Sequence, residues 1–330
     1  MQSSLITLND IKLARSRISG VAIHTPIVQL LEHPHSPPLY LKAECLQPIG
    51  AFKIRGAYNK IASLTVAEKA RGVIAYSSGN HAQGVAYSAG TLGIDSTIVM
   101  PSTAPTVKIE QTRKLGANII EVCEGSEEDW KTTAECIATD HGLAMIPPFD
   151  DEIIIAGSGT AGLEICDDLP EVDLVLVPTG GGGLLSGVAA ALKLSGSKAK
   201  IVGVEPELAG DARASFRRNQ IVEFKLEQTR QTMADGMRAT RIGTRNFQHM
   251  QAFVDDILVV TEKDIENAIR RITLDAGLVV EPSGAVAAAA WLFDRDKLPT
   301  AQNVVAFVSG GNIDPIVLAD ILRRDTSRSV

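Results

Sequence analysis

Four consecutive glycines, Gly180, Gly181, Gly182 and Gly183, follow the apolar segment DLVLVP and precede a second apolar segment, LLSGVAAALKL. Consecutive glycines let backbone N–H groups converge on an anion, and the N-terminus of a following helix adds positive charge. One or two glycines would satisfy a tight turn, so four in a row favour a phosphate site over a plain turn. Neither the GxGxxG spacing nor a GK[ST] ending is present. The pattern therefore predicts a phosphate monoester held by backbone amides.

Lys53, in the segment GAFKIRGA, is a candidate amine nucleophile. The neighbouring Phe52 and Ile54 could desolvate its amine, which would favour reactivity. The alternative is a lysine at the edge of an amphipathic helix, whose alkyl chain covers apolar surface. The residue types alone leave both interpretations open.

The segment Ser77-Ser78-Gly79-Asn80-His81 directly follows the apolar run VIAY. Two hydroxyls, an amide and free N–H groups could bind a carboxylate, although an ordinary helix cap would use the same residue types. An amine, a carboxylate site and a phosphate site together suggest pyridoxal phosphate (PLP) acting on an amino acid.

The elements that must position these segments alternate between apolar strands and amphipathic helices. Strands rich in Val, Ile and Leu that are separated by helices indicate parallel sheets buried on both faces. We therefore predict an α/β protein with two open, mostly parallel, doubly wound sheets. Ligands of such sheets bind at the carboxyl ends of the strands, where SSGN, PTGGGG and VSGGN occur.

The length of 330 residues predicts about two domains. Residues 73–148 form a compact β-α-β-α-β-α-β pattern. We expect them to be a small, lid-like domain inserted into a large PLP-binding domain made of residues 1–72 and 149–330. The polar stretch 207–256 is either a surface excursion or a wall of the active site, and its periodicity does not decide between them.

Composition excludes several classes of protein. A net charge of −7 and a pI near 5.5 argue against nucleic-acid binding. No apolar run approaches the roughly 18–20 residues of a membrane span, and the first residues lack the apolar block of a signal peptide. The four cysteines, at positions 45, 123, 136 and 166, are too dispersed to suggest a zinc site or a disulfide framework. We expect a cytoplasmic protein.

Five motifs in one order resemble the serine/threonine dehydratases and serine racemases, which are PLP enzymes of the tryptophan-synthase-β-like fold (fold type II). They are GAFKIRGA, SSGNHAQGVA, PTGGGGLLSG, EPSGA and VSGGN, and the resemblance covers nearly the whole chain. It implies a homodimeric threonine/serine ammonia-lyase that eliminates water from a β-hydroxy amino acid and yields a 2-oxo acid and ammonia. The alternatives are a serine racemase, a 3-hydroxyaspartate dehydratase or racemase, and a catalytically silent PLP- or amino-acid-binding protein.

The resemblance also implies roles for single residues. Lys53 would bind PLP as a Schiff base and remove the α-proton of the substrate. Asn80 would hydrogen-bond the 3-hydroxyl of the cofactor, and Ser309 would face its pyridine nitrogen. The other expected cofactor contacts are Phe52, Gly180, Gly181, Gly182, Gly183, Leu184, Gly236 and Glu281. The residues expected around the substrate carboxylate are Ser77, Ser78, Gly79 and His81, and Ser78 is also the matched acid–base for racemisation.

The segment GVEPELAGDARAS resembles the divalent-cation site of the racemase-like members of this family. The implied ligands are Glu205, the Ala209 carbonyl and Asp211, an all-oxygen set that suits Mg²⁺, Ca²⁺ or Mn²⁺. Without the resemblance, the two acids would be interpreted as solvated loop residues. Pro48 and Ile49 replace the Lys-Thr pair that helps to bind ATP in animal serine racemases, which argues against nucleotide activation.

Overall fold

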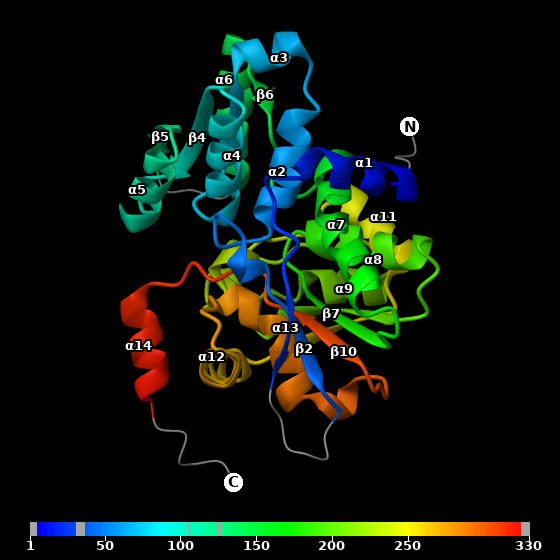
Figure 1. Ribbon diagram of the computed structural model, residues 1–330. Helices are drawn as coiled ribbons and strands as arrows, with labels where there is room; N and C mark the ends of the chain where they lie inside the picture. The colour runs from blue at the N-terminus through cyan, green and yellow to red at the C-terminus, as the bar shows by residue number, and fades with distance from the viewer. Residues whose placement is uncertain (1–4, 31–36, 105, 124–126, 325–330) are drawn as a thin grey trace.

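The computed structural model describes residues 5–30, 37–104, 106–123 and 127–324. The described strands form two separate sheets (Figure 1). The larger sheet has six strands in the order β1-β2-β10-β7-β8-β9, with bounds β1 Ile27–Leu30, β2 Leu39–Lys42, β7 Leu174–Pro178, β8 Lys200–Pro206, β9 Asp256–Val260 and β10 Val304–Phe307. The smaller sheet has the order β5-β4-β3-β6, with bounds β3 Val73–Tyr76, β4 Ser96–Pro101, β5 Asn118–Val122 and β6 Ala144–Met145.

All the described strand pairs are parallel except β1 with β2. The α-helices that connect and cover the strands are α1 Leu8–Ile18, α2 Lys53–Ala62, α3 Val66–Arg71, α4 Asn80–Thr91, α5 Thr106–Lys114, α6 Glu127–His141, α7 Glu152–Asp168, α8 Gly183–Leu194, α9 Asp211–Arg218, α10 Leu226–Thr229, α11 Thr244–Phe253, α12 Glu262–Ala276, α13 Pro282–Phe293 and α14 Pro315–Arg323. Four short 3₁₀ helices complete the described elements: η1 Glu44–Leu46, η2 Glu207–Ala209, η3 Asp235–Met237 and η4 Arg295–Lys297.

Alternation along β7 shows how the large sheet is buried on both faces. Leu174 and Leu176 belong to an apolar cluster with α12 and α13, whereas Val175 and Val177 pack with α7, α8 and α11. Successive side chains of a strand point to opposite faces, so the continuous apolar run of β7 serves both layers. This arrangement confirms the predicted α/β fold with doubly wound, mostly parallel sheets.

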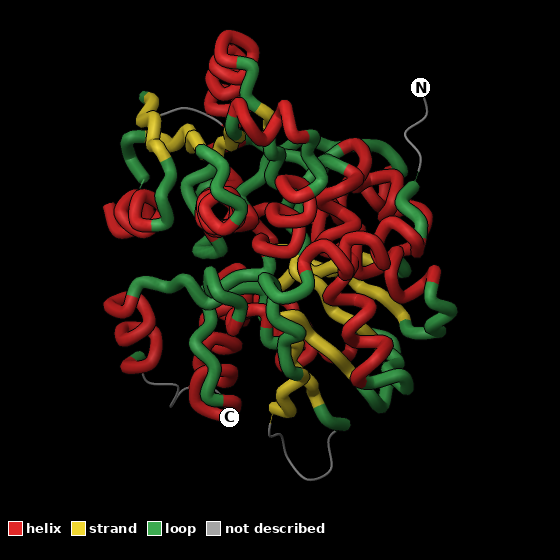
Figure 2. Tube along the Cα trace, turned by 45° about the horizontal axis from the view of Figure 1, so that its top comes forward, coloured by secondary structure: helices red, strands yellow, loops and turns green. Residues whose placement is uncertain are grey.

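The small sheet has the same two-layer construction. Val73 and Ala75 of β3 pack with α2 and α4, and Ile74 and Tyr76 pack with α6 on the other face. Figures 1 and 2 show the two groups of strands well apart, with helices around each. In the part of the chain that the structure describes, no helix is long and apolar enough to cross a membrane.

Candidate active site

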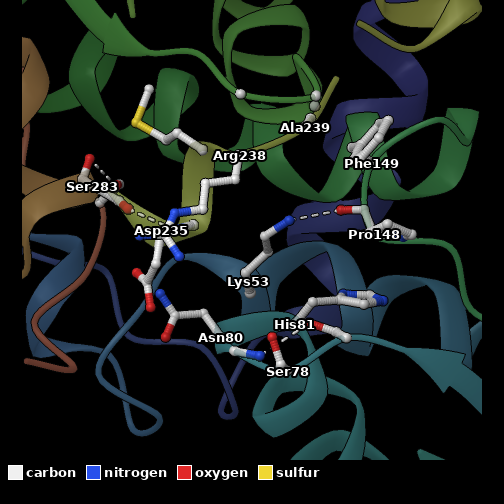
Figure 3. A pocket seen from close by; sticks show the side chains of 18 of the residues that line it. Lys53, Ser78, Asn80, His81, Pro148, Phe149, Asp235, Arg238, Ala239 and Ser283 are labelled. Atoms are coloured by element: carbon white, nitrogen blue, oxygen red, sulfur yellow. Dashed lines mark hydrogen bonds between the residues drawn. The ribbon is translucent and has the colours of Figure 1, made fainter. Parts of the chain in front are cut away.

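The carboxyl ends of strands from both sheets open onto one cavity of about 640 Å³ (Figure 3). All the residues for which the sequence predicted a cofactor or substrate contact line this cavity: Phe52, Lys53, Ser77, Ser78, Gly79, Asn80, His81, Gly180, Gly181, Gly182, Gly183, Leu184, Gly236, Glu281 and Ser309. They are spread over more than 250 positions of the chain, and the fold brings them together as the strand-end rule predicts. Their individual contacts with ligands stay predictions.

Lys53 is the first residue of α2, and its backbone is tied to the end of β10. The Phe52 N–H donates a hydrogen bond to the Ser309 carbonyl at 3.0 Å, and Ala51 forms an isolated antiparallel bridge with Gly310. The Nζ of Lys53 donates to the Pro148 carbonyl at 2.8 Å. The amine therefore lies inside the cavity on a backbone that is fixed relative to Ser309.

The glycine segment forms the turn between β7 and α8. Gly182 has a φ of +94°, a conformation that favours glycine, and α8 begins at Gly183 without a side-chain cap. A Cβ at Gly181 would collide with the ring of Phe149, so no side chain fits there. Uncapped helical N–H groups behind a turn without side chains match the requirements of a phosphate monoester.

Asn80 links the start of α4 to the opposite wall of the cavity. Its Nδ2 donates to Glu281 Oε1 at 2.5 Å, and its Oδ1 accepts from Asn312 Nδ2 at 2.7 Å. Burial, and then the negative charge of Asp235, raise the pKa of Glu281 to about 7, although the bond from Asn80 opposes this shift. Asn80 is thus held on both sides of its amide, and its contact with a cofactor hydroxyl stays a prediction.

His81 is neutral at physiological pH. Burial, and then the positive charge of Lys53, lower its pKa to about 3. Its Nε2 lies 2.9 Å from the Ile146 carbonyl, which can only accept, so Nε2 carries the proton. The ring is therefore anchored to the small sheet and does not act as a cationic acid. Ser77 and Ser78 lie beside it, and the Ser77 Oγ accepts from the Gly79 N–H at 3.2 Å.

Comparison with known proteins identifies the family. A family model described as pyridoxal-phosphate dependent enzyme matches residues 18–310. The chain belongs to this family.

Three relatives show where this PLP-dependent enzyme lies within the family. It is 42% identical over 328 residues to an L-threonine ammonia-lyase of Thermotoga maritima, and the match covers 98% of this chain and 80% of the relative. A threonine deaminase from T.th. superimposes with a TM-score of 0.87 at 38% identity, over 94% of this chain and 99% of that one. A maize serine racemase superimposes with a TM-score of 0.90 at 34% identity, over 96% and 97% of the two chains.

The polar stretch 207–256 supplies one wall of the cavity of this PLP-dependent enzyme. The interpretation of this stretch as a wall of the active site is therefore confirmed. The lining residues from this stretch are Leu226, Arg230, Asp235, Gly236, Met237, Arg238 and Ala239. Only Gly236 was predicted. The charged residues there resemble solvated loop residues in the sequence. Of the other missed lining residues, Lys108 carries no motif, whereas Phe149 belongs to the segment Pro148-Phe149-Asp150, which resembles the dehydratases. For the charged residues of 207–256, the one available signal was the polarity of the whole stretch, which in the structure also contains α9, α10 and α11.

Four buried charges lie behind the helix that carries Lys53; we refer to Lys42, Glu44, Arg55 and Glu164 as the buried ion cluster. Arg55 binds Glu44 through Nε and Nη2, both at 2.7 Å, and binds Glu164 through Nη1 at 2.6 Å and Nη2 at 2.8 Å. The Nζ of Lys42 lies 2.6 Å from Glu164. Burial alone would raise the pKa of Glu44, but the charge and hydrogen bonds of Arg55 outweigh it and hold the pKa below its usual value.

The predicted metal ligands Glu205, Ala209 and Asp211 lie outside the cavity of the PLP-dependent enzyme. All three are buried, at 0%, 1% and 1% exposure. The two Glu205 oxygens accept from the N–H groups of Ala212 and Arg213, at 3.0 and 2.7 Å, whereas Asp211 Oδ2 has no hydrogen-bond partner in the described structure. Within residues 5–30, 37–104, 106–123 and 127–324, no group of three or more His, Cys, Asp or Glu side chains could hold a metal. The interpretation as solvated loop residues is wrong, because both carboxyl groups are buried.

Proposed function

We propose that this enzyme is a threonine/serine ammonia-lyase, which removes water from a β-hydroxy amino acid and releases a 2-oxo acid and ammonia. The observation that carries the proposal is one cavity that combines the Lys53 amine, the glycine turn at α8 and the fixed Asn80 amide. The threonine ammonia-lyase and threonine deaminase named above support this choice of reaction.

In this proposal the cavity has a separate place for each part of PLP. The amine of Lys53 would hold the cofactor covalently, and the N–H groups from Gly180 to Leu184 would hold its phosphate. Asn80 would meet the 3-hydroxyl, and Ser309 would meet the ring nitrogen. The positive φ of Gly182 and the start of α8 without a side-chain cap support this fit, since they leave the backbone N–H groups of the turn available to an anion.

PLP, when bound, supplies an aldehyde for the substrate amino group and a ring that withdraws electrons from the α-carbon. The hydroxyls and backbone N–H groups of residues 77–81, at the N-terminus of α4, would orient the substrate carboxylate. Lys53, once released, would accept the α-proton. Ser309 provides a hydroxyl, which does not stabilise a protonated ring nitrogen as a carboxylate would. Electron withdrawal is then weaker, which favours loss of the β-hydroxyl as the α-proton leaves.

Residues 73–148 would serve as a lid over the substrate. Support comes from the small sheet, whose four strands all fall within this range, and from His81, which connects the cavity to Ile146 of the same range. The large domain would then comprise residues 1–72 and 149–330. Closure would exclude water from the cavity and bring residues 77–81 onto the substrate.

A divalent cation, Mg²⁺, Ca²⁺ or Mn²⁺, would bind Glu205, Asp211 and the Ala209 carbonyl, away from the reacting atoms. The unpartnered Asp211 Oδ2 and the burial of both carboxyl groups support this assignment. Two buried carboxylates with few hydrogen-bond donors repel each other, and a cation between them would compensate their charge. The cation would stabilise the fold on that side of β8.

The proposed enzyme would be a cytoplasmic homodimer. All four cysteines are free thiols, which suits a reducing compartment. Exposed apolar side chains on α14 and on or just after α12 support a dimer, because a second copy of the chain would cover them. They are Leu274, Val279, Ile316 and Val317, which are 69%, 52%, 72% and 45% exposed. Sedimentation of the purified enzyme would give its oligomeric state.

The deciding experiment incubates the PLP-loaded enzyme with L-threonine, L-serine and D-serine, and measures 2-oxo acid, ammonia and the enantiomers of the remaining substrate. The proposal expects 2-oxo acid and ammonia in equal amounts from the L-amino acids. Interconversion of L- and D-serine would add the racemase activity, for which Ser78 is the candidate second acid–base. In that case Ser78→Ala should lose interconversion and keep elimination from the L-form. A PLP-loaded enzyme that does neither would be the silent binding protein.

A further inference from the structure

Arg238 lies in the cavity wall directly after η3, on a loop that is fixed on several sides. The Gly236 N–H donates to Ser283 Oγ at 3.0 Å, and Thr229 Oγ1 donates to the Arg238 carbonyl at 3.1 Å. A Cβ at Gly180 would lie 3.2 Å from the Met237 Cα, so this loop packs against the glycine turn. The backbone of Arg238 is therefore held at a defined place beside the proposed cofactor site.

The guanidinium of Arg238 is oriented but only partly satisfied. Its Nε and Nη2 donate to the Thr232 carbonyl at 3.1 and 2.7 Å. Its Nη1 has no hydrogen-bond partner, and the side chain forms no ion pair, among the residues that the structure describes. By contrast, Lys108 and Asp235 of the same cavity are paired with each other. Arg238 thus presents an uncompensated positive charge with one free edge.

The cavity places this charge on the far side of Lys53 from the proposed carboxylate site. In Figure 3, Lys53 lies between Arg238 on one side and Ser78 and His81 on the other. The neighbouring Ala239 also lines the cavity. A substrate whose α-carboxylate occupies residues 77–81 and whose α-carbon meets Lys53 would direct its side chain toward Arg238.

We propose that Arg238 makes this enzyme select β-hydroxy amino acids that carry a second carboxylate, of which 3-hydroxyaspartate is the smallest. The inference rests on the proposed ammonia-lyase reaction and makes dicarboxylic β-hydroxy amino acids, rather than serine and threonine, the preferred substrates. The side chains of serine and threonine offer a guanidinium no charge, whereas a carboxylate forms a short, charge-assisted pair with it. Loss of the α-proton and the β-hydroxide as water, then uptake of one water and release of ammonia, would convert 3-hydroxyaspartate into oxaloacetate.

The test measures kcat/KM of the PLP-loaded enzyme for L-serine, L-threonine and the threo and erythro forms of L-3-hydroxyaspartate. We expect at least one form of 3-hydroxyaspartate to exceed L-serine by about tenfold or more, the effect of one charge-assisted hydrogen bond. Arg238→Ala should lower the ratio of kcat/KM for 3-hydroxyaspartate to that for serine by about tenfold or more. Arg238→Lys should restore part of it, because the charge is kept and the planar fork is lost.

Arg241→Ala is the matched control, because Arg241 is an exposed arginine of the same loop that does not line the cavity. It should leave the ratio unchanged. A second readout needs no turnover: succinate, a dicarboxylate without an amino group, should protect the loaded wild-type enzyme and Arg241→Ala against thermal unfolding, but not Arg238→Ala.

Three results would overturn the inference. The first is turnover of serine or threonine with no turnover of either form of 3-hydroxyaspartate. The second is an Arg238→Ala enzyme with weaker PLP binding and an equal loss for all substrates, which would assign the guanidinium to the cofactor phosphate. The third is succinate protection that survives in Arg238→Ala. An enzyme that acts on none of these amino acids would overturn the proposed function as well.

Discussion

Glu205 and Asp211 bring two carboxyl groups into the interior near each other with too few donors. Burial, and then the charge of Asp211, raise the pKa of Glu205 well above its usual value, and burial raises the pKa of Asp211 to about 8. At neutral pH, ionisation of this pair therefore opposes folding unless a cation compensates it. This burial of two carboxyl groups is the physical argument for the proposed cation.

The pair predicts a pH-dependent response to divalent cations. The folded state binds more protons than the unfolded state between the usual pKa of 3.8 and about 8, so stability falls as pH rises through that window. At pH 8, Ca²⁺ or Mg²⁺ at about 100 times its dissociation constant should raise the Tm by roughly 5 °C relative to chelator, and at pH 5 by much less. Thermal unfolding from pH 5 to 8 measures both effects.

Asp211→Asn should abolish the response to the cation, because it removes one of the two charges. Glu207→Gln provides the control, since Glu207 is an exposed acid in the same segment. Equal Tm values in calcium and in chelator at every pH would show that Glu205 and Asp211 bind no divalent cation.

Single-residue chemistry could be predicted from the sequence only where a motif carries it. Lys53, Asn80 and the glycine turn were found in this way, and they line one cavity. The neutral state of His81 was out of reach, because its pKa depends on burial and on Lys53, which come from different elements. Arg238 was not predicted either, because its position in the cavity wall depends on the fold. Nothing near it in the sequence distinguishes it from a solvated loop arginine.

At the scale of elements, the buried ion cluster fixes the helix that carries Lys53. Arg55 of α2 binds Glu44 of η1 and Glu164 of α7, and Lys42 of β2 binds Glu164 as well. Arg55 and Lys42 are fully buried, so water does not screen these contacts. Two positive and two negative charges balance, and they join three elements of the large sheet layer to α2.

Arg55→Met should therefore destabilise the protein by about 3–5 kcal/mol, because it leaves Glu44 and Glu164 buried with one lysine between them. Arg15→Ala is the control, since Arg15 pairs with Asp167 at the surface, where the side chains are 48% and 56% exposed. The loss of that surface pair should cost about 1 kcal/mol or less. Urea unfolding of the three proteins gives both values, and similar losses in the two variants would contradict a special role for the cluster.

The helices and parallel strands were largely predictable, because long apolar runs and Gly or acidic boundaries mark them. The residues NIIEV, for instance, form β5, and the predicted helix up to Gly142 is α6, which ends at His141. The strands β1 and β2 were not predicted, since each has only four residues and β2 includes Lys42, whose burial depends on Glu164. Charged residues buried in pairs mislead any argument from hydrophobic pattern.

For the whole molecule, the most informative contact joins the small sheet layer to the cavity wall. Lys108 of α5 forms an ion pair with Asp235 of η3, and both residues line the cavity. The side chains are 19% and 39% exposed, so solvent weakens the pair without removing it. If residues 73–148 are a lid, this ion pair stabilises its closed position.

Lys108→Ala should raise the KM for the amino-acid substrate by about two- to fivefold, the effect of one partly exposed ion pair. Lys114→Ala is the control, because Lys114 is an exposed lysine of the same helix outside the cavity. Steady-state kinetics of both variants measure the effect. A KM that is unchanged in Lys108→Ala, or raised equally in both, would mean that the pair does not hold the lid.

The proposed function depends on the assignment of Lys53 as the amine that holds PLP in this cavity. Its most direct test is reduction of the PLP-loaded enzyme with borohydride, digestion, and mass spectrometry of the peptide that carries the phosphopyridoxyl group. We expect the label on Lys53 and its absence from Lys53→Ala, which should also lose 2-oxo acid formation. A label on Lys108, which lines the same cavity, or no labelled peptide at all, would show that Lys53 does not hold PLP.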